Sequence, residues 1–302
     1  MRFFAAYVLR GYWQAALTTA ACALLSLLLP PFGYLSSAAL ALVTLAKGPK
    51  AGLVTCGIAA LFVAAMALLA FGTPVLAFGL LLIVWLPAWL LSFSLGQWNA
   101  LGLSVLLSIA VGFVLVTGAY VVVDAPAQLW QDYYLDDLLP AMKQAGLAVE
   151  VSAELEQRLY SVARLMTGAL TAVMLFGLLL SVLLARYWQA VLQQPGAFGA
   201  EFRSLRLGMS AAALAGLLLL ASLIGDGTVA ELSANLLLVS AVGFVLQGLA
   251  LIHAAAYAFS AQVGWLVGFY VLLILLPQVG LMVALFGWLD NLVQFRRRLP
   301  QR

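Results

Sequence analysis

Long, uninterrupted apolar runs constrain this chain more than any other feature of its sequence. Runs of about 17 to 25 apolar residues recur along it, and a helix of that length crosses the roughly 30 Å hydrocarbon layer of a bilayer. Because 66% of the 302 residues are hydrophobic and only 8% are charged, the apolar surface exceeds what a soluble core can bury. The runs do not alternate apolar and polar residues, which argues against an outer-membrane barrel. The sequence therefore predicts an all-α, polytopic integral membrane helix bundle.

Prolines, glycines and short polar turns divide the apolar sequence into about eight full spans. Pro30 and Pro31 cannot continue a helix and end the first span, and the KGPK turn at residues 47–50 precedes the third. The expected spans are residues 11–29, 32–46, 51–71, 75–93, 100–122, 162–185, 207–224 and 232–258.

An acidic insert separates two groups of spans. Residues 123–160 hold seven of the eleven acidic residues, and Leu129, Trp130 and Tyr133 begin a helical pattern that predicts an amphipathic surface helix. Ser152 is the expected N-cap of a helix that continues into the sixth span. We expect three domains: a five-helix membrane unit at residues 1–122, the extracytoplasmic insert at 123–160, and C-terminal membrane helices at 161–302 with a cytoplasmic loop at 186–206 and a basic tail.

Basic residues orient these spans in the membrane. Lysine and arginine accumulate in the cytoplasmic loops of membrane proteins, above all in short loops next to span ends. With the N-terminus in the cytoplasm, alternation places the acidic insert outside and the basic loops inside. The residues that set this orientation are Lys47, Lys50, Arg186, Arg203, Arg206, Arg296, Arg297 and Arg298.

The positive charge of the arginine-rich tail indicates whether residues 261–292 cross the membrane once or return to the same side. If this segment crosses once, residues 296–298 lie outside, against the positive-inside bias. Pro277 and Gly280 break it into two pieces of about 15 residues, roughly 23 Å each, which is short for a full crossing. We therefore expect a short or re-entrant helical hairpin broken near Pro277, which returns the C-terminus to the cytoplasm. A single crossing is the alternative.

Four side chains are candidate ligand contacts. Trp85 and Trp89 lie at i and i+4 around Pro87, so both indoles share one helix face at an expected kink. That face is either a wall of a ligand pocket or an anchor at the lipid headgroups. His253, the single histidine, lies one turn before Tyr257 on the same face. It takes part in a proton relay, in ligand binding or in a buried hydrogen bond.

Small residues of the first span form a candidate docking face. Ala16 and Ala20 let another helix approach closely, and that helix belongs either to a partner membrane protein or to the same chain. Besides the lipid bilayer, the expected partner is thus a membrane protein that docks through the first helix or through residues 186–206.

Motifs for catalysis, metal binding and nucleic-acid binding are missing from the sequence. No GxSxG, HExxH or GxxxxGK[ST] pattern occurs, and one histidine cannot supply the three or four ligands of a common metal site. The basic residues lie in short loops and form no stripe for nucleic acid. We therefore expect no catalytic residue, no metal, no cofactor and no nucleic-acid partner.

Two stretches of the sequence are distinctive: ARYWQAVLQQPGAFGAEFRSLRL at residues 185–207 and the segment from GLALIHAAAYAF to LFGWLDNLVQFRRR at residues 248–298. Both resemble the YybS-like family of predicted bacterial inner-membrane proteins. This resemblance implies a bacterial inner membrane and no particular reaction. The first five spans more weakly resemble the substrate-binding subunits of energy-coupling-factor vitamin transporters. That resemblance implies helix docking through Ala16 and Ala20.

Two functions fit these observations. The first is a small-molecule binding or transport component. The candidate ligand contacts indicate this function, as does the resemblance of the first five spans to the substrate-binding subunits of vitamin transporters. The alternative is a non-enzymatic membrane scaffold or assembly partner in the cell envelope, which the scarcity of ionisable groups within the spans indicates. An enzyme is the least expected class.

Overall fold

The computed structural model describes residues 2–146 and 152–300, and 87% of these residues are helical, with no strand among them. The predicted all-α class is therefore confirmed for the described residues. The helices form two compact units that interleave along the chain. Unit 1 comprises Met1–Ser108, Phe176–Arg206 and Ala250–Tyr257, and unit 2 comprises Ile109–Leu175, Leu207–Leu249 and Ala258–Arg302. The division into three sequence domains stays a prediction.

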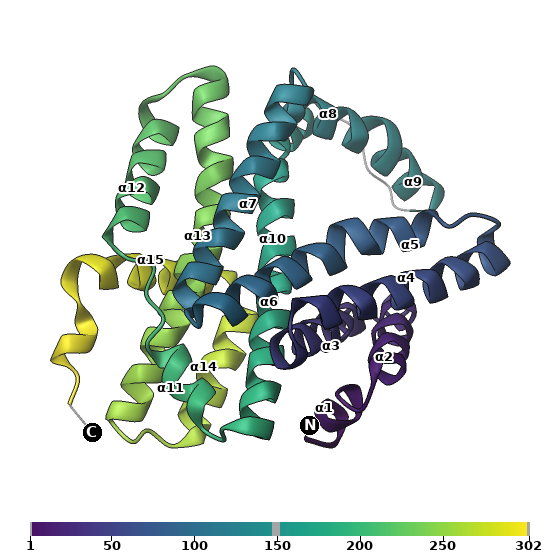
Figure 1. Cartoon of the computed structure of the whole chain (residues 1–302). Coiled ribbons are helices and arrows are strands. Elements are labelled where there is room, and N and C mark those ends of the chain that lie inside the picture. The colour runs from purple at the N-terminus through teal and green to yellow at the C-terminus, as the bar shows by residue number, and fades with distance from the viewer. Residues whose placement is uncertain (1, 147–151, 301–302) are drawn as a thin grey trace. The chain divides into compact units, whose positions relative to one another are not determined.

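Unit 1 is built mainly from the first helices of the chain (Figure 1). Three long helices contribute one end each to this unit: α7 (Leu101–Val122), α10 (Ala153–Gln193) and α13 (Gly227–Ala258). Its other elements are α1 (Arg2–Val8), α2 (Tyr12–Leu25), α3 (Pro31–Lys47), α4 (Pro49–Phe71), α5 (Val75–Gly79), the π-helical η1 (Leu80–Trp85), α6 (Leu86–Trp98) and α11 (Ala197–Arg203).

Pro87 changes the fourth predicted span without breaking it. The segments α5, η1 and α6 form one continuous helix, Val75–Trp98, with a π-helical turn at Leu80–Trp85. Proline has no N–H to donate to the preceding turn, and the wider π turn accommodates that loss. A π-helical turn that ends at Trp85, two residues before Pro87, thus lies where the kink is expected.

Unit 2 holds the acidic insert, α13 from its start to Leu249, and the C-terminal helices. Most of the described part of the insert is helical, and Trp130 Nε1 donates a hydrogen bond to Thr167 Oγ1 of α10 at 3.0 Å. Ser152 Oγ accepts a bond from the Leu155 N–H at 3.2 Å, so the predicted cap of α10 is confirmed. The further elements are α8 (Pro126–Asp132), the π-helical η2 (Tyr133–Leu138), α9 (Leu139–Gln144), α12 (Met209–Ile224), α14 (Val263–Leu275), α15 (Pro277–Val293) and the 3₁₀ turn η3 (Phe295–Arg298).

The helices α13 and α15 cross in backbone contact within unit 2. A Cβ atom on Gly287 would overlap the carbonyl oxygen of Phe244, and one on Gly248 would overlap that of Val283. Only glycine permits so close an approach of two backbones. This crossing fixes α15 against the middle of α13.

Five helices of the described chain are long and apolar enough to cross a membrane: α4, the Val75–Trp98 helix, α7, α10 and α13. A sixth span is present if α14 and α15 count as one bent span. The prediction of about eight full spans is not confirmed, because α2, α3 and α12 have only 14, 17 and 16 residues. The helix α2, which corresponds to the first predicted span, ends at Leu25, several residues before Pro30.

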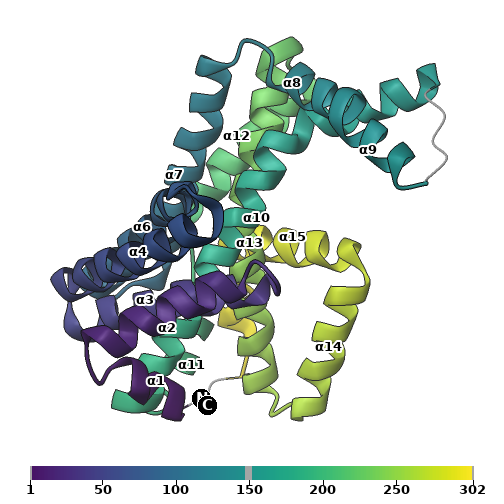
Figure 2. The same ribbon diagram turned by 90° about the vertical axis from the view of Figure 1, so that its right-hand side faces the viewer.

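The predicted helix break near Pro277 is confirmed. The axes of α14 and α15 bend by 115° at Leu276, the residue between them. Figure 2 shows α15 running across from the upper end of α14, and the chain after α15 turning back down. This geometry is that of a broken span or of a re-entrant loop.

Candidate functional site

Trp85 and Trp89 tie helices of unit 1 together. The Trp85 side chain is fully buried, and its indole N–H donates to the Ser36 hydroxyl of α3 at 3.0 Å. The Trp89 N–H donates to the Pro49 carbonyl at the start of α4 at 2.9 Å. Both polar groups are thus satisfied inside the protein, as buried indoles require. A ligand contact by these residues stays a prediction.

Ala16 and Ala20 lie in the core of unit 1. They are 1% and 0% exposed and belong to one apolar cluster with Leu40 of α3 and Cys56 of α4. Because their side chains are small, neighbouring helices of the same chain pack closely against α2. In the structure, this face of α2 therefore contacts helices of the same chain. Docking of a partner protein there stays a prediction.

His253 and Tyr257 contact the short helix α11 in unit 1. The His253 ring lies edge to face with Phe202, with 5.6 Å between ring centroids. The Arg203 guanidinium carbon lies 4.0 Å from the centroid of the Tyr257 ring, a cation–π geometry. The structure thus joins two candidate ligand contacts to the segment at 186–206, a link that sequence spacing alone does not reveal.

Most of the predicted polar loop at residues 186–206 is helical, because residues 186–193 belong to α10 and residues 197–203 form α11. Arg186 continues α10, and its Nε lies 2.8 Å from Glu201 Oε2 of α11, with both side chains about one fifth exposed. Gln189 accepts a bond from the Arg186 guanidinium and donates to the Leu45 carbonyl of α3. Three further basic residues that are predicted to set the topology, Lys47, Lys50 and Arg206, are exposed.

A buried polar cluster in unit 2 consists of Gln247, Asp290, Asn291 and Arg296. Gln247 and Asp290 are fully buried, and Arg296 Nε lies 3.3 Å from Asp290 Oδ2. The Gln247 amide donates to the same Asp290 oxygen at 3.4 Å, and its own oxygen accepts from Asn291 Nδ2. The cluster therefore holds α13, the end of α15 and the tail together.

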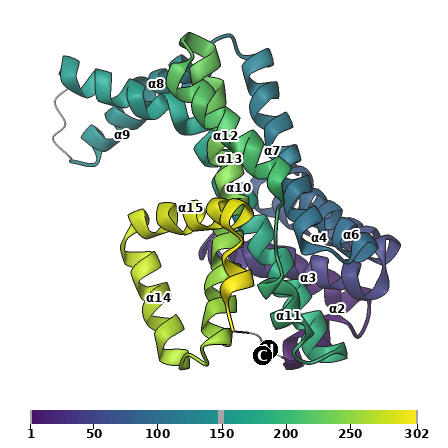
Figure 3. The same ribbon diagram turned by 90° about the vertical axis from the view of Figure 1, so that its left-hand side faces the viewer.

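The chain segment before α12 joins the same polar cluster. The Leu207 N–H donates to Gln247 Oε1 at 2.9 Å, and the Gly208 N–H donates to Asn291 Oδ1 at 3.1 Å. Figures 1 and 3 show the start of α12 beside the end of α15. The tail, with Arg297 and Arg298 exposed, thus lies at the same end of unit 2 as the start of α12.

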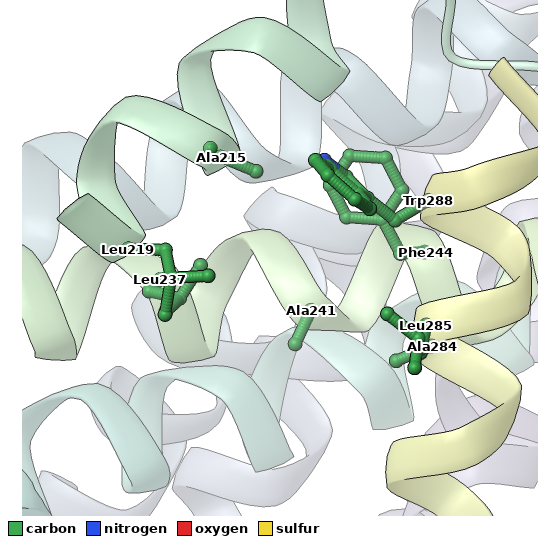
Figure 4. Close-up of a pocket in the computed structure, with 9 residues that line it drawn as sticks. Ala215, Leu219, Leu237, Ala241, Phe244, Ala284, Leu285 and Trp288 are labelled. Atoms are coloured by element: carbon green, nitrogen blue, oxygen red, sulfur yellow. The ribbon is translucent and has the colours of Figure 1, made fainter. Parts of the chain in front are cut away.

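An apolar cavity of about 210 Å³ lies between α12, α13 and α15 (Figure 4). The Trp288 N–H, its most polar group, donates to the Ala212 carbonyl at 2.8 Å, so the remaining wall is hydrocarbon. The lining includes Ala215 and Gly216 of α12, Ala241 and Phe244 of α13, and Leu285 and Trp288 of α15.

The size and walls of this cavity restrict what it can bind. An engineered cavity of about 150 Å³ with apolar walls holds benzene, whereas sites for drug-sized ligands begin near 300 Å³. The cavity therefore suits one ring or a segment of a hydrocarbon chain. Its alanines, leucines and glycine look like any lipid-facing helix in the sequence, which is why sequence reasoning missed them. Within residues 2–146 and 152–300, no group of three or more His, Cys, Asp or Glu side chains is arranged to hold a metal ion.

The comparison with protein families gives one match. Residues 17–291 match the family described as "Predicted membrane protein (DUF2232)", so the chain belongs to that family. No curated protein and no solved structure matches the chain.

Proposed function

We propose that this chain, as a member of that family, binds the hydrocarbon part of a small molecule in the cavity of unit 2. It would serve as a small-molecule binding or transport component of the bacterial inner membrane. The observation that carries the proposal is the uniformly apolar wall between α12, α13 and α15. The resemblance to the YybS-like family supports the location.

Physical chemistry supports an apolar ligand over a polar one. Each methylene group that leaves water for such a cavity contributes about 0.8 kcal/mol, whereas an unpaired polar group costs about 1–3 kcal/mol. The wall offers hydrocarbon and one indole whose N–H is already engaged. None of the residues named in the lining is a nucleophile, an acid or a base, which supports binding without chemical conversion.

The surroundings of the cavity support entry from the bilayer. Leu220 of α12 and Leu281 of α15 are 55% and 71% exposed, and both lie on helices that form the wall. Apolar side chains at this exposure are solvated by lipid when their helices lie in a membrane. A hydrophobic ligand would therefore enter the cavity laterally from the bilayer, without passing through water.

A cavity-filling variant tests the proposal. A Cβ atom on Gly216 would lie 3.6 Å from Trp288 Cζ2, an ordinary contact, so Gly216→Leu places its side chain in the cavity without backbone overlap. Gly118→Leu, on α7 where a Cβ meets open space, is the matched control. We expect native mass spectrometry to find a hydrophobic molecule on the wild type and the control, and about tenfold less on Gly216→Leu. An empty wild-type protein that no alkyl compound stabilises thermally would refute the proposal.

We also propose that both termini face the cytoplasm and that α14 and α15 form a re-entrant loop. The polar cluster supports this, because it ties the tail to residues 207–208, directly after the basic segment at 186–206. The short helix α12 would add a crossing to the five long spans. At 1.5 Å per residue it is roughly 24 Å long, enough for a thin or locally compressed bilayer.

A further inference from the structure

The cavity begins directly beside the polar cluster and extends away from it. Along α13, Phe244 precedes Gln247 by three residues and Leu237 precedes it by ten, which is roughly 5 and 15 Å at 1.5 Å per residue. Along α15, Trp288 precedes Asp290 by less than one turn. A hydrocarbon chain in the cavity therefore has one end near the polar cluster and the other deeper between α12 and α13.

Two exposed arginines follow Arg296, which belongs to the polar cluster. The Arg296 side chain is 10% exposed and bound to Asp290, so it holds the 3₁₀ turn η3 against the end of α15. Arg297 and Arg298 follow in the same turn, and both are exposed. In the described part of the chain, no carboxylate forms an ion pair with either of them. Since Arg296 pairs with Asp290, Arg297 and Arg298 add net positive charge at this end.

From this arrangement we infer that the ligand is an anionic phospholipid of the surrounding leaflet, with one acyl chain in the cavity and its phosphate at Arg297 and Arg298. The inference rests on the proposed function and adds the class of ligand. Arginine suits a phosphate because its planar guanidinium donates two parallel hydrogen bonds. Anionic headgroups also attract basic residues that lie at the end of a membrane helix.

The order of groups along unit 2 matches the order of groups in a phospholipid. The charged side chains come first, the indole of Trp288 follows at the boundary, and the apolar wall continues to Leu237. Indole rings prefer this position between headgroup and hydrocarbon. A second acyl chain would lie against the exposed side of Leu285, which is 54% exposed.

Lipids with identical chains and different headgroups test this inference. We expect phosphatidylglycerol to stabilise the detergent-purified protein thermally at about tenfold lower concentration than phosphatidylcholine. In the double variant Arg297→Gln/Arg298→Gln, the two lipids should act at equal concentrations. The double variant Lys47→Gln/Lys50→Gln, with the same loss of charge in unit 1, should keep the wild-type difference.

The outcomes separate this inference from the proposed function. If both lipids stabilise the wild type equally and Gly216→Leu abolishes the effect, the cavity binds hydrocarbon and the inference about the headgroup is wrong. If a free fatty acid stabilises the protein and phosphatidylglycerol does not, the ligand is a carboxylate and the phospholipid is refuted. If no compound acts on the wild type, the proposed function fails as well.

Discussion

The Asn235 side chain satisfies two backbone groups of another helix, one N–H and one carbonyl. Its Oδ1 accepts the Gly168 N–H at 2.6 Å, and its Nδ2 donates to the Arg164 carbonyl at 2.7 Å. In a regular α-helix these two groups pair with each other, because they are four residues apart. A Cβ atom on Gly168 would come within 2.6 Å of the Asn235 backbone, so glycine is needed for the approach. The fully buried amide thus joins α13 to α10.

Replacing Asn235 by leucine should destabilise the protein by about 2 kcal/mol, because the amide loses bonds to the α10 backbone and to Tyr120. Interhelical bonds in membranes are individually worth less than this, but here several are lost together. The free energy of unfolding in a detergent titration measures the effect. Gln278→Leu, at an exposed position of α15, should stay within about 0.5 kcal/mol of wild type. Equal effects of the two variants would contradict this account.

Sequence patterns predict the long elements well and the short ones poorly. The run at 51–71 and the cap at Ser152 gave α4 and the start of α10 nearly as observed, because apolar length and capping are local properties. The helix α11 was missed, since its seven residues are held by contacts such as Arg186 with Glu201, which are distant in sequence. Local patterns carry no information on such pairs.

Sequence reasoning could not locate the cavity either. Its walls consist of residues that pack against lipid, against other helices or around a void with equal ease, so composition does not distinguish these cases. The polar residues were more informative. Within apolar runs, Asn235 bonds to the backbone of α10 and Gln247 bonds to Asp290 of α15. Polar groups within apolar runs must find partners, and this requirement makes them predictable.

The path of α14 and α15 through the membrane determines on which side of the membrane the C-terminal tail lies. Cysteine labelling tests this location. In a variant with Cys22 and Cys56 replaced by alanine, single cysteines at Gln194, Asp226 and Pro300 are all at exposed positions. In intact cells a membrane-impermeant maleimide should label Asp226→Cys alone. After lysis, Gln194→Cys and Pro300→Cys should react too. Labelling of Pro300→Cys in intact cells would show that α14 and α15 together make one crossing.

For the molecule as a whole, lipid must act as solvent for much of the surface. The helix α14 has no buried residue, and Val263, Ile274 and Leu275 are 76%, 80% and 68% exposed. Apolar patches of that extent are rare on monomeric soluble proteins. Family membership and the five long apolar helices point to the same environment.

Washing membranes with alkaline carbonate should therefore leave the protein in the pellet, whereas a mild nonionic detergent should extract it as folded protein. Carbonate removes proteins held at the surface by charge, but it does not reduce the cost of exposing apolar side chains to water, about 25 cal/mol for each Å². The helical circular dichroism and a cooperative thermal transition of the extract would show that the fold survives. A peripheral membrane protein, released by the same wash, serves as the control. Recovery of the chain in the supernatant after lysis without detergent would contradict the membrane assignment.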